Sequence, residues 1–114
     1  MAVPSSSEIV QAQVDAFNAR DLERFLSFYA DDARILDYPD QVLASGKDAM
    51  RDRYRKLFQP AEQLHATIQH RTVFDRFVID QERVTGLPDG KVTDAVAIYE
   101  TKGGRIVRVT FLRP

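Results

Sequence analysis

Four segments with β-type patterns, separated only by tight turns, fill the second half of the chain and constrain its fold more than any other feature. They span residues 64–73, 77–85, 92–101 and 105–113. In the turn "LPDG", Pro88 presets its own φ angle and Gly90 tolerates a positive one. Because strands joined by such short connections pair as antiparallel neighbours, the sequence predicts an antiparallel meander.

The first half of the chain predicts a helical hairpin. Ser5 and Glu8 have the spacing of a capping box. Apolar residues follow them at helical intervals, and Gln13 is the only polar member of that stripe. Asp21 can cap a second helix, and we expect this helical unit to end near Asp31. The apolar stripe of the second helix consists of Leu22, Phe25, Leu26 and Tyr29.

A short strand and a third helix should connect the hairpin to the meander. We expect the strand over residues 33–38, ended by Pro39 because proline cannot donate to a β ladder. Period-two alternation places Asp37 on the same face as two apolar residues. A glycine-containing loop then leads to a helix over residues 47–58. Helices followed by an antiparallel sheet indicate an α+β fold, and the chain shows no repeat or internal linker, so we expect one domain over residues 1–114.

The overall charge excludes several classes of partner. The chain has 16 basic and 17 acidic residues and a net charge of −1. A surface for nucleic acid or an anionic membrane needs a clustered basic excess, so we expect neither partner. No apolar run approaches the roughly 18 residues that span a membrane. The N-terminal "MAVPSSSE" lacks the basic and apolar regions of a signal peptide, and we expect a cytoplasmic protein.

Metal, thiol and nucleotide chemistry have no support in the residue pattern. The chain has no cysteine, which removes disulfides, thiol catalysis and cysteine-ligated zinc. His65 and His70 lack the spacing of helical metal ligands, so no metal and no cofactor are expected. Phosphate-binding glycine loops and serine-nucleophile motifs are absent from the sequence. Carboxylate chemistry remains, with His70 as a possible partner.

The inward faces of the strands decide which carboxylates could act. In 92–101, the bulkier aliphatic face should point inward and carry Asp94 with it. In 77–85, two choices remain open: either Asp80 and Glu82 face inward, or they face solvent. Inward carboxylates cost free energy unless they are paired or line a solvated or ligand-filled pocket. The inward choice therefore predicts a polar pocket, which Asp37 and the His70 face of segment 64–73 would also line.

Four stretches resemble the nuclear transport factor 2-like superfamily, and most closely its SnoaL-like and ketosteroid-isomerase-like branch: "FYADDARILDYP", "GKDAMRDRYRKLF", "VIDQERVTG" and "GGRIVRVTFLRP". The resemblance covers about residues 9–113. It implies a cone, in which a curved antiparallel sheet wraps around the helical hairpin and third helix and encloses a pocket. It also implies a homodimer through the outer sheet face, and places Asp80, Glu82 and His70 on the pocket side.

The resemblance assigns roles to individual residues. Asp37 matches the general-base aspartate that moves a proton next to a carbonyl, and Tyr29 and Tyr54 match pocket tyrosines. The two hydrogen-bond donors of the isomerase oxyanion hole are replaced by Gln13 and Val96. Because losing one such donor typically costs on the order of 10²–10³ in rate, efficient ketosteroid isomerisation is not expected.

Two functions follow as hypotheses. In the first, Asp37 is a general acid or base, with His70 and either Glu82 or Asp80 as its partner. The reaction would be an isomerisation, aldol-type cyclisation, dehydration or hydrolysis of a small polar carbonyl-containing or cyclic molecule. The expected substrate-binding residues are Gln13, Tyr29, Tyr54, Asp80, Glu82, Asp94, Val96, Val109 and Phe111. In the second, the pocket binds a ligand without chemistry, or the sheet serves as a dimerisation platform. The outer face would then consist of Ala95, Ala97, Tyr99, Thr110 and Leu112. Asp37 could instead cap the turn-forming "DYPD" loop.

Overall fold

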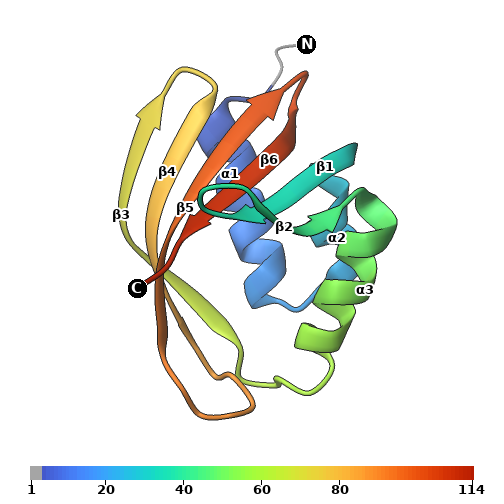
Figure 1. Cartoon of the computed structure of the whole chain (residues 1–114), viewed down its shortest axis with the longest axis vertical. Helices are drawn as coiled ribbons and strands as arrows, with labels where there is room; N and C mark the ends of the chain where they lie inside the picture. The colour runs from blue at the N-terminus through green and yellow to red at the C-terminus, as the bar shows by residue number, and fades with distance from the viewer. Residues whose placement is uncertain (1–3) are drawn as a thin grey trace.

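Three helices lie on one face of a curved six-stranded sheet in the computed structural model, which describes residues 4–114 (Figure 1). The elements are α1 (Ser6–Asn18), α2 (Leu22–Ser27), β1 (Tyr29–Asp37), β2 (Gln41–Ser45), α3 (Lys47–Phe58), β3 (His65–Phe74), β4 (Phe77–Thr85), β5 (Thr93–Lys102) and β6 (Arg105–Leu112). The strand order is β2-β1-β6-β5-β4-β3, and β1 runs parallel to β6. The predicted α+β class and the meander of β3 to β6 are confirmed. The start of the predicted domain at residue 1 lies outside the described residues.

Both predicted helix caps are confirmed. The Ser5 hydroxyl accepts a hydrogen bond from the Glu8 backbone N–H at 3.2 Å, and the Glu8 carboxylate accepts one from the Ser5 N–H at 3.0 Å. The Asp21 carboxylate accepts from the Arg24 N–H at 3.3 Å. The second helix ends at Ser27, earlier than expected, because the chain already joins the sheet at the next-but-one residue.

The connection between the hairpin and the meander contains more sheet than expected. The predicted strand at 33–38 is the end of the longer β1, and β2 occupies a segment that we expected to be a loop. Strand β2 forms one edge of the sheet and pairs with β1, with Ala44 opposite Ile35. The predicted third helix is confirmed as α3, residue for residue.

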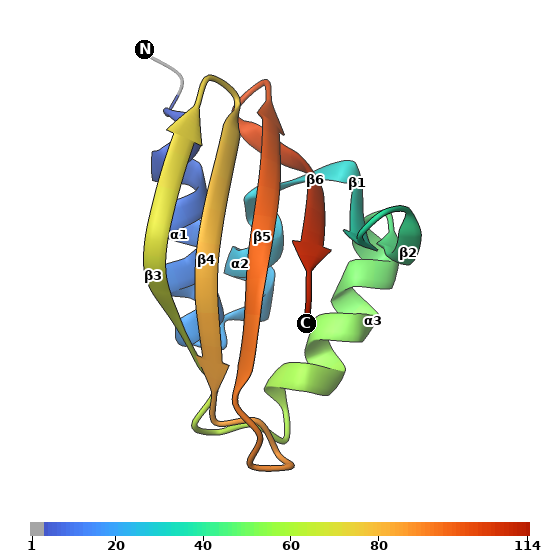
Figure 2. The same ribbon diagram turned by 60° about the vertical axis from the view of Figure 1, so that its left-hand side comes forward.

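The helices are fixed to each other by aromatic packing around Phe25 of α2. Its ring centroid lies 4.6 Å from that of Tyr54, 5.1 Å from Tyr29, 5.8 Å from Phe58 and 6.1 Å from Phe17. These rings come from α1, β1 and α3, so a single cluster ties the three helices to the start of the sheet. The long strands β3, β4 and β5 run side by side, with α1 behind them (Figure 2).

The buried and outer faces of β5 are the reverse of our prediction. Its buried face carries Ala95, Ala97 and Tyr99, whereas Asp94 and Val96 lie on the outer face. We expected the face with the bulkier aliphatic residues to be buried, but small residues are needed where neighbouring rings fill the interior. Ala97, for example, lies opposite the Phe111 ring of β6. The predicted outer dimerisation face is therefore wrong in its three residues from β5.

A β-bulge in β3 reverses the predicted position of His70. Ile68 pairs with Glu82 and His70 pairs with Gln81, so Gln69 is an extra residue without a partner. One inserted residue shifts every following side chain to the other face. His70 is consequently exposed, and Arg71 takes the inward position. Within residues 4–114, no helix has the length and apolar character needed to cross a membrane.

Candidate functional site

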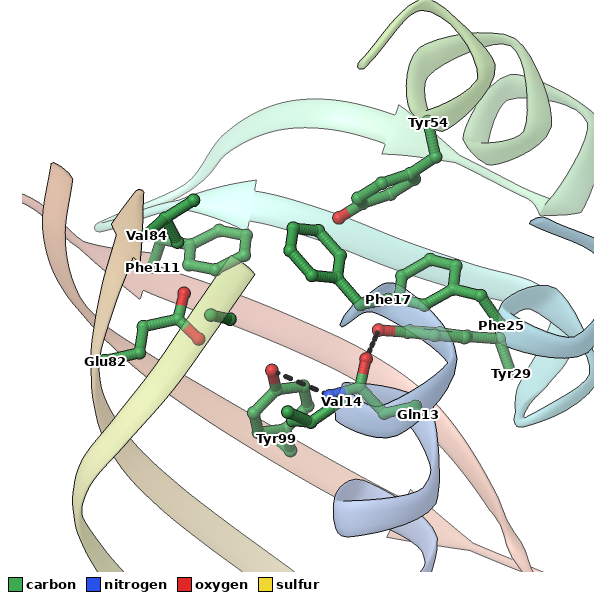
Figure 3. A pocket seen from close by; sticks show the side chains of 11 residues that line it. Gln13, Val14, Phe17, Phe25, Tyr29, Tyr54, Glu82, Val84, Tyr99 and Phe111 are labelled. Atoms are coloured by element: carbon green, nitrogen blue, oxygen red, sulfur yellow. Dashed lines mark hydrogen bonds between the residues drawn. The ribbon is translucent and has the colours of Figure 1, made fainter. Parts of the chain in front are cut away.

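A cavity between α1, α3 and the inner face of the sheet is lined mainly by aromatic rings (Figure 3). The rings are those of Phe17, Phe25, Tyr29, Tyr54, Tyr99 and Phe111. The inner chamber measures about 40 Å³, and a vestibule of about 260 Å³ leads to it. Chamber and vestibule share lining residues, among them Tyr54 and Glu82, so they form one continuous site.

Glu82 is the carboxylate of this cavity. It lies on β4, is only 8% exposed, and extends its side chain into the chamber (Figure 3). No side chain within residues 4–114 donates a hydrogen bond to it. Burial raises the pKa of Glu82 from 4.5 to about 7, and the negative charge of Asp80 adds to this rise, while Arg113 opposes it. Near neutral pH, the protonated and the ionised forms of Glu82 are therefore both populated.

The neighbouring carboxylate, Asp80, is fully buried but does not line the cavity. Both of its oxygens accept hydrogen bonds from Arg71, at 2.6 and 2.8 Å. Arg71 also donates to Gln11 of α1 at 2.8 Å. The predicted inward orientation of Asp80 is confirmed, but the carboxylate is occupied by an ion pair that joins β3, β4 and α1.

Three polar side chains form a directional hydrogen-bond chain at the inner end of the chamber (Figure 3). The Tyr29 hydroxyl donates to Gln13 Oε1 at 2.9 Å, and Gln13 Nε2 donates to the Tyr99 hydroxyl oxygen at 3.1 Å. The hydroxyl hydrogen of Tyr99 thus stays available for a ligand oxygen. Burial raises the pKa of Tyr29 and of Tyr99 well above 10, so both remain protonated donors.

Tyr99 is the site residue that sequence reasoning missed, because β5 was assigned to the wrong face. The signal that could have found it is Gln13, since a polar amide on a buried stripe needs partners inside the protein. Tyr54 lies where chamber and vestibule meet, and burial raises its pKa to about 12. It too keeps its proton at neutral pH.

Asp37 lies at the end of β1, beside the vestibule rather than in the chamber. Its side chain is 28% exposed, and Arg113 Nε donates to Asp37 Oδ1 at 2.8 Å. The guanidinium carbon of Arg113 lies 4.7 Å from the centroid of the Phe111 ring. Arg113 lines the vestibule, whereas the Asp37 side chain does not line it and binds Arg113 instead.

Three further predicted site residues lie outside the cavity. Asp94 is exposed on the outer face, where Arg83 binds both of its oxygens at 2.8 and 3.1 Å and lowers the pKa of Asp94. Val96 shares that face, so it does not replace an oxyanion-hole donor. His70 is exposed beyond the bulge.

The remaining predicted site residues divide between the cavity and the core. Val109 is buried in the core. The structure brings together Gln13, Tyr29, Tyr54, Glu82 and Phe111. Within the described part of the chain, no group of three or more His, Asp or Glu residues is arranged to hold a metal ion.

Comparison with known proteins reveals the relatives of this chain. The model of a family described as "SnoaL-like domain" matches residues 10–109. No curated protein sequence matches. An uncharacterised cystatin-fold protein from Novosphingobium aromaticivorans is 31% identical, with a TM-score of 0.89 over 96% of this chain and 99% of that one.

Two further solved structures share the fold at lower identity. A candidate polyketide cyclase from Sinorhizobium meliloti is 22% identical, with a TM-score of 0.78 over 91% of this chain and 93% of that one. A candidate ketosteroid isomerase from Kribbella flavida is 19% identical, with a TM-score of 0.81 over 96% and 77%. At these identities the likeness concerns the fold.

Proposed function

The chain belongs to the SnoaL-like domain family, and on that premise we propose that it is an enzyme that moves a proton on a carbon next to a carbonyl group. Glu82 is the general acid and base. The observation that carries this proposal is a buried carboxylate inside an aromatic cavity that receives no hydrogen bond from residues 4–114. Burial at this place raises the pKa of Glu82 to about 7. A proton-transfer group works best when its pKa lies near the operating pH.

In the proposed reaction, the ionised Glu82 carboxylate takes a proton from the carbon next to the substrate carbonyl. The electron pair of the broken C–H bond forms a carbon–carbon double bond, and the carbonyl π pair moves onto oxygen. The Tyr99 hydroxyl donates a hydrogen bond to this enolate oxygen, where such donors stabilise developing charge most strongly. Protonated Glu82 then returns the proton to the same carbon, which amounts to exchange or epimerisation. Where the substrate carries a carbon–carbon double bond between its β and γ carbons, the enolate is extended over that bond, and return of the proton to the γ carbon moves the double bond and completes an isomerisation.

Gln13 and Tyr29 position the donor. Tyr29 donates a hydrogen bond to Gln13, and Gln13 donates one to the Tyr99 hydroxyl oxygen. Because the Tyr99 oxygen is the acceptor, its hydroxyl hydrogen can be donated to the ligand. The Tyr99 hydroxyl thus supplies an oxyanion-hole hydrogen bond, which the resemblance had led us to regard as lost. Asp37 is assigned a different task, which is to hold Arg113 at the vestibule.

The dimensions of the cavity limit the substrate to a small molecule. Taken together, the vestibule of about 260 Å³ and the chamber of about 40 Å³ reach only the lower end of the roughly 300–1,000 Å³ of common ligand pockets. Relatives named for a ketosteroid and for a polyketide agree with carbonyl chemistry, but they do not carry the proposal.

Deuterium exchange tests the proposal without knowledge of the natural substrate. Small ketones and keto acids are incubated with the protein in D₂O, and proton NMR follows loss of the signal next to the carbonyl. We expect Glu82→Gln to reduce the exchange rate by about 100-fold or more, consistent with removal of a general base. With ketones that carry no carboxylate, Asp37→Asn should keep exchange within a few-fold of the unmodified protein.

Two results would contradict the proposal. Equal exchange by Glu82→Gln and the unmodified protein would remove Glu82 from the mechanism. Ligands that bind without any exchange would instead support a binding module.

A further inference from the structure

We propose that the vestibule selects small carboxylic acids, whose anionic end binds between Arg53 of α3 and Arg113 after β6 while the carbonyl end reaches Glu82. This inference rests on the proposed function, because it names the substrate class of the same site. Arg53, Arg113 and Glu82 all line the vestibule. An arginine fork matches carboxylate geometry better than any other side chain.

Arg113 is held in place but keeps free hydrogen-bond donors. Its Nε donates to Asp37 at 2.8 Å, and its guanidinium lies against the Phe111 ring. The two terminal nitrogens of Arg113 have no hydrogen-bond partner within residues 4–114. Because one ion pair and one ring fix the group, little conformational entropy remains to be lost when it binds an anion.

Arg53 and Arg55 are exposed arginines of α3 without a carboxylate partner in the described part of the chain, and of these two it is Arg53 that lines the vestibule. Two other basic residues of this helix are paired: Arg51 contacts Glu23 and Asp48, and Lys56 contacts Asp52. Arg53, Arg113 and Tyr54 line the same vestibule, so both guanidinium groups border the space through which a ligand reaches the chamber. Their positive charges also lower the pKa of Tyr54 against the effect of burial.

The walls between the arginines and Glu82 are largely apolar. They include Phe17, Leu57, Leu87 and Phe111. A matching ligand has a short apolar body with a carboxylate at one end and a carbonyl near the other. Arg113 also faces Glu82 and lowers its pKa, so a bound anion that neutralises Arg113 should raise that pKa.

The test compares short keto acids with their methyl esters. Isothermal titration calorimetry with a panel from levulinate to benzoylpropionate, each beside its ester, separates recognition of charge from recognition of shape. We expect the best acid to bind about tenfold more tightly than its ester, which is the order of one charge-assisted hydrogen bond. The preference should weaken as salt concentration rises.

Variants locate the effect on the two arginines. Arg53→Gln and Arg113→Gln should each weaken acid binding about tenfold and leave ester binding unchanged, which also shows that the variants are folded. Arg55→Gln is the matched control, because Arg55 lies on the same helix but lines a different depression. Equal binding of acid and ester, or an equal loss in Arg55→Gln, would overturn the inference.

The variant Glu82→Gln separates this inference from the proposed function. If the acid preference remains while exchange is lost, both hold. If exchange depends on Glu82 but no acid is preferred over its ester, only the carboxylate-selecting vestibule fails.

Discussion

Glu82 and Asp37 carry the same chemical group in different surroundings, and the difference decides their roles. Asp37 is partly exposed and bound to Arg113, whereas Glu82 is buried and receives no hydrogen bond from residues 4–114. The alternation pattern and the family resemblance both drew attention to Asp37. They could not reveal the ion pair, because Arg113 lies 76 residues away in the chain.

The raised pKa of Glu82 predicts that protein stability falls as pH rises. The folded-state pKa of about 7 lies above the ordinary 4.5, so the contribution of Glu82 is fully present below pH 4.5 and is lost as pH passes through 7. The difference corresponds to about 3 kcal/mol. Urea unfolding at pH 5 and pH 8 should therefore show a smaller loss for Glu82→Gln than for the unmodified protein. Parallel losses in the two proteins would contradict the burial of this charge.

At the scale of elements, the sequence predicts positions along the chain better than orientations. Capping residues, turn residues and apolar periodicity correctly predicted three helices and the four strands of the meander. The same patterns could not predict the bulge at Gln69, because a bulge is a shift in the pairing of β3 with β4 and the sequence of β3 alone does not show it. They also could not choose the inner face of β5, since alternation defines two faces and does not say which one is buried.

The bulge has an energetic consequence, because it brings Arg71 to Asp80. Arg71→Leu should lower the free energy of unfolding by about 3–5 kcal/mol, since it leaves a fully buried carboxylate without its partner. The double variant Arg71→Leu with Asp80→Leu should recover much of that loss. Chemical denaturation measures both. A loss below about 1 kcal/mol for the single variant would show that Asp80 finds another partner or reaches water.

At the scale of the whole molecule, the resemblance predicts the fold and leaves assembly as a proposal. The outer sheet face differs from the expected one in its β5 residues, which are Val96 and Ile98, whereas Thr110 and Leu112 of β6 lie beside them as expected. Adjacent pairing of these residues across β5 and β6 makes them one patch. We propose that this patch carries the expected homodimer.

Light scattering after size-exclusion chromatography tests the assembly. The unmodified protein should elute with the mass of a dimer, and Ile98→Lys should convert it to a monomer, because the substitution places a charge in an apolar contact. The matched control Val42→Lys changes an exposed apolar residue on the edge strand β2 and should not alter the mass. A monomeric unmodified protein would contradict the proposal.

Glu82 should exchange a proton near neutral pH although its carboxylate is buried. Carbon-13 NMR of the glutamate side-chain carboxyl groups, with the Glu82 signal assigned by its loss in Glu82→Gln, measures this property. We expect a titration midpoint of about 7 for Glu82. A midpoint near 4.5 would contradict it, because Glu82 would then be an ordinary carboxylate and a poor proton donor at neutral pH.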